Sequence, residues 1–201
     1  STSVTTLLAG LAFGLSLIVV FGGQNTYVLR VGLARRHVLT VVSICAVSDV
    51  ALIAAGVAGT GVALDSRPWL LRLVRIAGAA FLLGYGTLAA RRALRPSTLQ
   101  SGEGHTTISL AAAVGTAVAL TWLNPGVYLD TVVLLGSVAQ TQTQPWWFGI
   151  GAALGSVLWF FSLGYGARLL TSRLTRPGAW RALDGFVAAV MSVTGLRVLL
   201  G

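Results

Sequence analysis

Two aspartates lie within long apolar stretches of this 201-residue chain. Asp49 stands in the middle of one stretch, where an ionised Asp costs about 2.5–3.5 kcal/mol on membrane-insertion scales. No basic residue follows one helical turn later, since Ile53 occupies that position. Asp130 follows Pro125 by five residues, about 7.5 Å of helix. Such side chains normally face the interior of a helix bundle, so both are candidates to bind a cation, with structural ion pairing as the alternative.

Two apolar stretches are interrupted near their middles, one by Gly22 and Gly23 and the other by Pro125. Proline removes a helix hydrogen bond and clashes with the preceding turn. Each break frees backbone groups at a depth where lipid cannot bond them. Amides at a new helix N-terminus attract a carboxylate. Freed carbonyls can hold an ammonium group, together with the neighbouring amide side chains of Gln24, Asn25 and Asn124. The alternative is a kinked helix that binds nothing.

The elements that carry these residues have the length of membrane helices. The composition is 55% hydrophobic and 9% charged, against about 25% charged in an ordinary soluble domain. A membrane span needs about 20 apolar residues, and six stretches meet that need: Val4–Leu29, Val38–Val62, Trp69–Ala90, Ile108–Val138, Trp146–Leu170 and Ala182–Leu200. We therefore predict an all-α membrane protein with six transmembrane helices, of which the first and fourth are interrupted.

The positive charge gathers in alternate connections. Six spans place the first, third and fifth connections on one side, with Arg30, Arg35, Arg36, Arg91, Arg92, Arg95, Arg168, Arg173, Arg176 and Arg181. The excess of arginine predicts that this side is cytoplasmic and that both termini face outward. A first segment that dips in and returns would instead leave the N-terminus in the cytoplasm. Because the arginines separate apolar runs, the net charge of +9 does not indicate a nucleic-acid binder.

The two halves of the chain resemble each other weakly. Residues 27–30, Tyr-Val-Leu-Arg, precede Val-Tyr-Leu-Asp at 127–130 by 100 residues, and residues 72, 75 and 86 match 181, 184 and 195 with an offset of 109. Since each half holds three spans, the halves must be inverted relative to one another, a pattern typical of transporters. We predict a single transmembrane domain over 1–201, with one repeat at about 1–95 and the other at about 105–201.

The inverted arrangement predicts two ion pairs. Arg75 and Asp130 would meet in the outer half of the membrane, and Arg30 and Asp184 in the inner half. Such pairs could act as alternating gates. Two alternatives remain: Arg30 and Asp184 are merely interfacial, or Arg75 reaches Asp49 instead.

Three motifs connect these residues to a known family. They are Gly22-Gly23-Gln24-Asn25 with Tyr27-Val28-Leu29-Arg30, Arg35-Arg36-His37-Val38 with Ile44-Cys45-Ala46-Val47-Ser48-Asp49, and Thr121-Trp122-Leu123-Asn124-Pro125-Gly126-Val127-Tyr128-Leu129-Asp130. Together they resemble the LysE family of lysine and arginine exporters, and the resemblance covers essentially the whole chain. Gly23 departs from the family, which usually has proline there. Because glycine also interrupts a helix, we expect the break to remain.

The resemblance implies export of L-lysine or L-arginine across the inner membrane of a bacterial cell. An amino acid zwitterion would use the helix breaks, and its cationic side chain would use Asp49 or Asp130. Moving one positive charge outward against 100 mV costs about 2.3 kcal/mol, which exchange for one inward proton would cancel. We therefore expect proton antiport. The alternative is an exporter of the same fold for a neutral amino acid or a small cation.

Other classes of function find little support in the sequence. Ser48 beside Asp49 has no His at membrane depth to activate it, and one cysteine with two scattered histidines makes no metal cluster. We expect no enzyme activity, no cofactor and no metal. Small residues at four-residue spacing, Ala51, Ala55 and Gly59, allow close helix packing and a homodimer without requiring one.

Overall fold

The computed structural model describes residues 2–20, 22–59, 66–94, 109–170 and 177–200. Within these residues every regular element is a helix. This follows from the apolar sequence, because a helix satisfies its backbone hydrogen bonds internally where water is absent. Three long helices and one short helix start at a proline, whose missing N–H and fixed φ suit the first turn.

The helices comprise four long ones and two bent groups. The long helices are α3 (Val38–Val57), α5 (Pro68–Leu94), α9 (Pro145–Leu170) and α10 (Pro177–Leu200). Each contains a stretch long and apolar enough to cross a membrane. The bent groups are α1 (Thr2–Ile18) with α2 (Gly23–Ala34), and α6 (Leu110–Trp122) with α7 (Pro125–Tyr128), the π-helical η2 (Leu129–Leu134) and α8 (Leu135–Gln140). Their bends are 84° and 56°, and each group is apolar enough to form one broken span. Both breaks fall where the sequence places them.

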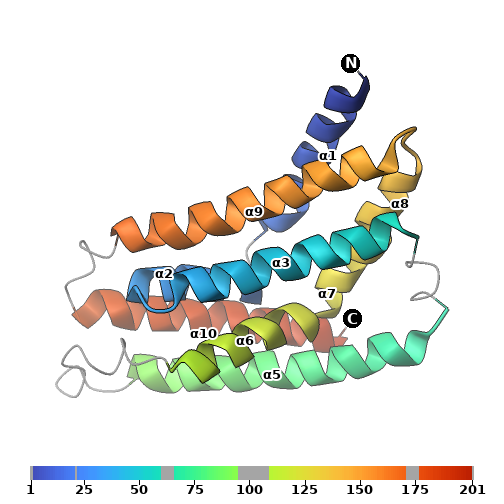
Figure 1. Cartoon of the computed structure of the whole chain (residues 1–201). Coiled ribbons are helices and arrows are strands. Elements are labelled where there is room, and N and C mark those ends of the chain that lie inside the picture. The colour runs from blue at the N-terminus through green and yellow to red at the C-terminus, as the bar shows by residue number, and fades with distance from the viewer. Residues whose placement is uncertain (1, 21, 60–65, 95–108, 171–176, 201) are drawn as a thin grey trace.

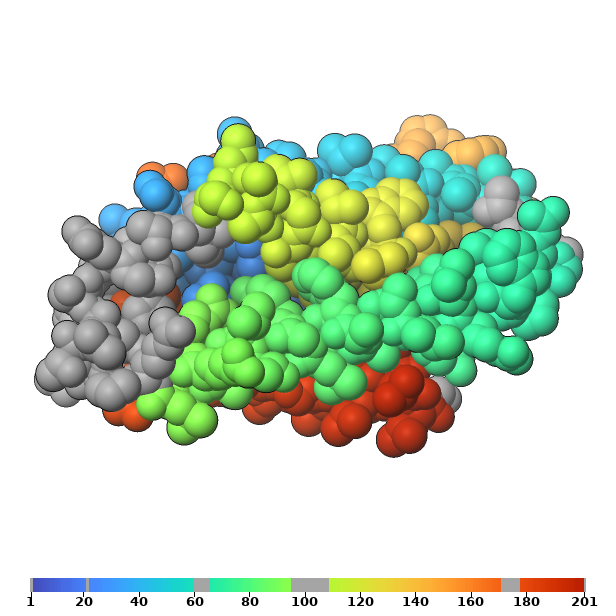
Figure 2. Space-filling view, turned by 90° about the horizontal axis from the view of Figure 1, so that it is seen from below, coloured from blue at the N-terminus to red at the C-terminus, as the bar shows by residue number. Residues whose placement is uncertain are grey.

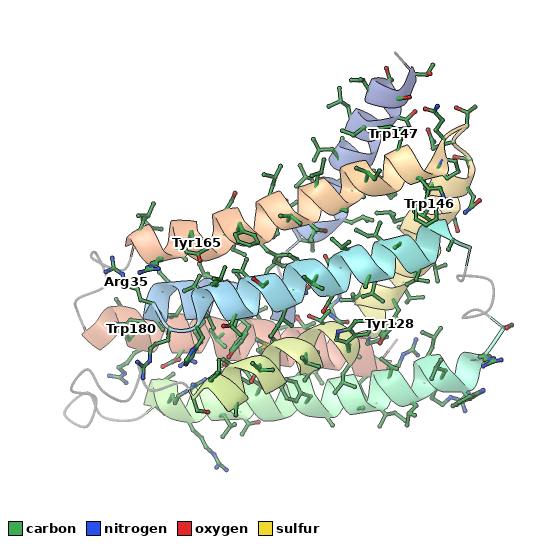
Figure 3. All side chains as sticks on the ribbon, in the orientation of Figure 1. Arg35, Tyr128, Trp146, Trp147, Tyr165 and Trp180 are labelled. Carbon is green, nitrogen blue, oxygen red and sulfur yellow. The ribbon has the colours of Figure 1, made fainter. Side chains whose placement is uncertain are left out.

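The helices lie side by side as an elongated bundle with two distinct ends (Figure 1). At one end α2, α5 and α9 finish and α3, α6 and α10 begin; we call it the basic end, because Arg35 and Arg168 lie there. Both chain termini lie toward the opposite, far end, where Ser3 of α1 donates a hydrogen bond to Gln144 before α9. Figure 3 shows Trp146 and Trp147 toward the far end and Trp180 toward the basic end. Tryptophans at both ends are typical of the two interfaces of a membrane.

Glycines allow the backbones of neighbouring helices to come into contact. The helices α1 and α9 run parallel, since Gly10 faces Phe148 and Gly14 faces Ala152. A Cβ on Gly151 would lie 2.0 Å from the carbonyl oxygen of Leu7. Such contacts between small residues give membrane helices their van der Waals packing without a hydrophobic driving force.

The predicted connections at the basic end are shorter in the structure. Arg30, Arg91, Arg92, Arg168 and Arg181, which the sequence analysis assigns to connections, all lie in helices. Arginine stabilises the last turn of a helix through the helix dipole and by bonding its free carbonyls. Two helix ends show this bonding. At the end of α5, Arg181 Nε donates to Ala93 O, and at the end of α9, Arg35 Nε donates to Arg168 O. Two predicted span ends, Val62 and Ile108, lie outside the described residues. So do three arginines of the predicted connections: Arg95, Arg173 and Arg176.

The packing of α1 on α9 predicts a position-specific effect of alanine. Gly151→Ala should lower the melting temperature in detergent, because the new methyl group overlaps the Leu7 carbonyl and overpacking costs about 1–3 kcal/mol. Gly166→Ala on the same helix is the control: a Cβ at that position would have no atom within 4 Å, and alanine is the better helix former. Equal melting temperatures for both variants would contradict this packing.

Candidate functional site

One cavity of about 440 Å³ lies between the two helix breaks. It is lined by α1, α2, α3, α5, α7, η2, α8, α9 and α10. All eight residues predicted to bind substrate line it, namely Gly22, Gly23, Gln24, Asn25, Asp49, Asn124, Pro125 and Asp130. Arg75, predicted as a gating residue, lines it as well. Residues about 100 positions apart in the sequence therefore share one site.

The cavity deepens from the far end toward the middle of the bundle. Asp130 and Arg197 are exposed, whereas Asp49 is only 3% exposed. Toward the basic end the structure is closed around Gly23, where an added Cβ would lie within 3.3 Å of three side chains, those of Leu82, Leu120 and Met191. Beside it, Gln24 Nε2 donates to Thr121 Oγ1 over 2.9 Å and links α2 to α6. The cavity thus faces the far end.

At the first break the Asn25 side chain bonds the freed carbonyls. Its Nδ2 donates to Ile18 O over 2.6 Å and to Val20 O over 3.1 Å. Its Oδ1 accepts a hydrogen bond from Trp159 Nε1 over 3.1 Å. The expectation that Asn25 and these carbonyls are free to hold an ammonium group is therefore corrected: they bond one another, because carbonyls buried without a partner are costly. Asn25 shapes the cavity wall.

The second break is capped from within. Asn124 Oδ1 accepts from Gly126 N over 3.0 Å, and Asn124 O accepts from Val127 N over 3.1 Å. Pro125 has no N–H, so the first amides of α7 are unavailable to a ligand. Tyr128 OH donates to Trp122 O at the end of α6 over 2.8 Å. Of the two sites expected to attract a carboxylate, the one at α7 is thus filled by the chain itself.

The N-terminus of α2 differs from that of α7. Gly22 precedes it in an extended conformation and provides no side-chain cap. The first amides of a helix have no partner within the helix, and here they belong to Gly23, Gln24 and Asn25, which line the cavity. The start of α2 is therefore the part of the site best suited to a carboxylate.

Asp49 is the buried acid of the cavity. Its Oδ2 accepts a hydrogen bond from Ser156 Oγ of α9 over 3.1 Å, while its Oδ1 is buried without a hydrogen-bond partner. The preceding residue, Ser48, accepts from Trp122 Nε1 over 3.0 Å, which fixes α3 against α6. An unpaired carboxylate oxygen facing a cavity is suited to a cation, which would remove the cost of its isolation.

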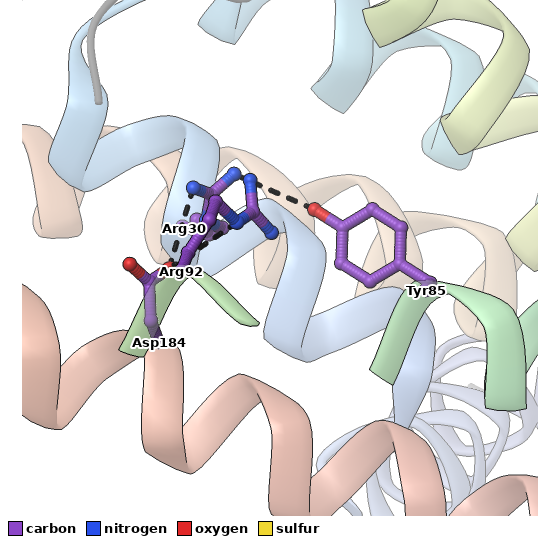
Figure 4. Close-up of polar contacts among 4 residues, drawn as sticks. All are labelled: Arg30, Tyr85, Arg92 and Asp184. Atoms are coloured by element: carbon purple, nitrogen blue, oxygen red, sulfur yellow. Dashed lines mark hydrogen bonds and ion pairs between the residues drawn. The ribbon is translucent and has the colours of Figure 1, made fainter. Parts of the chain in front are cut away.

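The two predicted ion pairs have different outcomes. Arg30 Nη2 lies 3.4 Å from Asp184 Oδ1, both almost fully buried (Figure 4). Arg92 Nε lies 3.9 Å from the same oxygen, with its guanidinium 5.6 Å from the ring centre of Tyr85. Arg75 and Asp130 line one cavity, but among the described residues no ion pair joins them. That pairing is therefore not formed in this conformation.

A smaller cavity of about 280 Å³ adjoins the Arg30 cluster, between α2, α5 and α6. In Figure 2 the blue of α2 is visible through a gap between α5 and α6. Tyr27, Arg30 and Tyr85 line it. It lies on the basic side of the closed region around Gly23.

Sequence reasoning missed four polar residues of the main cavity: Thr131, Ser156, Thr194 and Arg197. Ser156 follows Gly155 in a run that looks like helix packing, and its contact with Asp49 spans 107 residues. Arg197 is visible in the sequence as a lone charge near the end of an apolar run. Its position in the same cavity as Asp130 and Arg75 depends on the packing of α5 against α10.

Comparisons with known proteins agree on one family. The family model for the LysE type translocator matches residues 15–201. A candidate amino-acid transporter of Mycobacterium tuberculosis, Rv0488, is 44% identical over 187 residues, 92% of each chain. The arginine exporter protein ArgO of Yersinia enterocolitica is 41% identical over 187 residues, 92% of this chain and 91% of that one. No solved structure shows significant similarity to the chain.

The bonds at the two breaks predict that replacing Asn by Asp lowers the melting temperature at one break and leaves it nearly unchanged at the other. Asn25→Asp should lower the melting temperature markedly, because it replaces the two N–H donors with a carboxylate facing carbonyl oxygens; each buried group left unsatisfied costs about 1–3 kcal/mol. Asn124→Asp should change it little, because Asp serves equally well as an N-cap acceptor. Thermal unfolding in detergent measures both variants, and a similar loss in the two would refute the assigned bonds.

Proposed function

The chain belongs to the LysE family of translocators, and we propose that it exports a basic L-amino acid, L-lysine or L-arginine, across the inner membrane of a bacterial cell. Membership places it among translocators rather than enzymes. The observation that carries the proposal is the buried Asp49, which lines the cavity between the helix breaks and whose Oδ1 has no hydrogen-bond partner among the described residues. The similarity to an arginine exporter supports a cationic substrate.

The cavity matches the three charges of such a substrate. Its volume of about 440 Å³ lies within the range of about 300–1,000 Å³ usual for small-molecule sites. In our proposal the carboxylate binds at the N-terminus of α2, where no side chain caps the amides. The α-ammonium binds the polar wall near Gln24 and Asn124, and the side-chain cation reaches Asp49 or Asp130.

The arrangement proposed for this function is six spans in two inverted halves. Pairings between helices support it. α9 packs on both α1 and α2, and α3 packs on both α6 and the η2–α8 segment. An exchange of the two halves interchanges these sets, and it leaves the pairs α3 with α9 and α5 with α10 unchanged. The positive-inside rule then places the basic end in the cytoplasm and both termini outside.

Transport in this arrangement would proceed by alternating access. The cavity faces the far end, and the buried pair of Arg30 with Asp184 lies on the other side of the closed region around Gly23. We take this as an outward-facing conformation with the inner gate closed. Inward opening would break the Arg30–Asp184 pair and form a pair between Arg75 and Asp130 at the far end.

The energy for export would come from protons. One cationic amino acid leaving against 100 mV costs about 2.3 kcal/mol, and one proton entering returns the same amount. Either acid of the cavity, Asp49 or Asp130, could carry that proton after the substrate leaves. An exporter of the same fold for a neutral amino acid or a small cation is the second candidate. The exposed Asp130 suits the small cation, whereas a neutral amino acid would need no acid in the cavity.

Counterflow in proteoliposomes tests the substrate. Vesicles loaded with unlabelled L-arginine or L-lysine should accumulate the labelled amino acid through the wild-type protein. Asp49→Asn should lower the initial rate at least tenfold, because the amide retains the Ser156 contact but not the charge. Arg72→Ala, an exposed position outside the cavity on α5, is the control and should keep the wild-type rate.

Each other outcome of that measurement has a meaning. Unchanged counterflow in Asp49→Asn would move the cation site to Asp130. Folded wild-type protein that exchanges neither amino acid would favour the second candidate function.

Proton coupling predicts how efflux responds to imposed gradients. Efflux of labelled arginine should accelerate several-fold when the compartment facing the far end is made acidic, because inward protons then drive the exchange. A protonophore should abolish this acceleration. Since one cation leaves for each proton that enters, a potential imposed with potassium and valinomycin at equal pH should have little effect on the rate. Efflux that follows the potential and ignores pH would indicate uniport.

A further inference from the structure

We infer that Arg197 is a third member of the outer gate, and that it closes with Arg75 on Asp130. This inference rests on the proposed function, in which that gate exists. Arg197 has no part in the recognition of the substrate described above. It lines the same cavity as Asp130 and Arg75, and it lies in the last turn of α10.

The closed cluster at the basic end provides the pattern. There one acid, Asp184 of α10, is shared by Arg30 of α2 and Arg92 of α5 (Figure 4). Asp184 is fully buried, and Arg30 is 2% exposed. A buried carboxylate is costly unless nearby positive charge compensates it. Arginines from two further helices therefore stabilise Asp184 where the end of the bundle is closed.

The contact of α5 with α10 relates the two ends. A Cβ on Gly86 would touch Ser192 Oγ, and a Cβ on Gly195 would touch Leu83. The two contacts are equivalent under one shift, since 83 plus 109 is 192 and 86 plus 109 is 195. The same shift relates Arg75 to Asp184, which places Arg75 at the far end where Asp184 lies at the basic end.

Arg197 then takes the place that Arg92 has at the basic end. Each lies in the last turn of its helix, Arg92 in α5 and Arg197 in α10. The shift of 109 carries Arg92 to position 201, four residues beyond Arg197, or about one helical turn on the same face. The far end therefore also has one acid and two arginines, but Asp130 on η2 corresponds to Arg30, and Arg75 on α5 corresponds to Asp184.

The consequence concerns the fraction of time that the cavity is open rather than substrate binding. Asp49, the buried acid, belongs to α3 and bonds Ser156 of α9, so its contacts do not involve Arg197. Closing the far end would bury Asp130 together with Arg75, and a second arginine would add compensating positive charge, as Arg92 does beside Asp184. Removing Arg197 should therefore leave the cavity open for more of the time.

Cysteine labelling measures that open fraction directly. Cys45→Ala removes the one native thiol, and Val127→Cys then places a reporter in the cavity wall on a helix other than α10. Arg197→Ala should raise the rate of reaction with a membrane-impermeant maleimide several-fold, and Arg197→Lys should raise it less because the charge remains. Arg72→Ala is the control and should leave the rate unchanged. An unchanged rate in Arg197→Ala would overturn the inference.

Transport and binding separate a gate from a general structural role. In proteoliposomes Arg197→Ala should lower the maximal arginine exchange rate about tenfold, while equilibrium binding of labelled arginine to the solubilised protein stays within twofold of wild type. Parallel loss of binding and exchange would overturn the inference and indicate a direct ligand or misfolding. A wild-type protein that exchanges no basic amino acid, yet shows the labelling difference, would refute the proposed substrate and support the gate.

Discussion

The structure depends on one constraint: backbone and charged groups at membrane depth must find partners within the chain. Two helices are broken in the middle of the bundle, and each break exposes groups that lipid cannot bond. Asn25 bonds the carbonyls of the first break, and Asn124 and Tyr128 bond the groups of the second. With these bonds formed, the breaks are rigid walls, and the space between them is a cavity of defined shape.

The same constraint leaves the two breaks chemically unlike. The start of α7 is filled by Asn124 and lacks an amide at Pro125, whereas the start of α2 has no side-chain cap. Of the two helix starts at the breaks, that of α2 is therefore the one better suited to an anion. One substrate with one carboxylate needs one such site, and a symmetric pair would bind it in two opposed orientations. The difference between the halves thus fixes the direction in which an amino acid would lie.

Glycine contacts hold two pairs of helices close together on either side of the cavity. Gly10, Gly14 and Gly151 bring α1 and α9 into backbone contact. On α5 and α10, Gly86 faces Ser192 and Gly195 faces the side chain of Leu83. The cavity lies between these two packed pairs of helices, and the breaks and α3 complete its lining. The cavity residues therefore lie between two tightly packed groups, and relative movement of the groups would change access to the cavity from either end.

The sequence by itself determined the class of protein, the sites of both breaks and eight of the residues that line the cavity, because apolar length, proline, paired glycines and buried acids are local signals. It also predicted that Arg30 meets Asp184. Tertiary structure alone decided which polar groups stay free. The Asn25 side chain bonds the carbonyls of the break beside it. Ser156 donates a hydrogen bond to Asp49 across 107 residues of sequence. Among the described residues, Arg75 forms no ion pair with Asp130. These outcomes depend on distances between helices, which no local pattern contains.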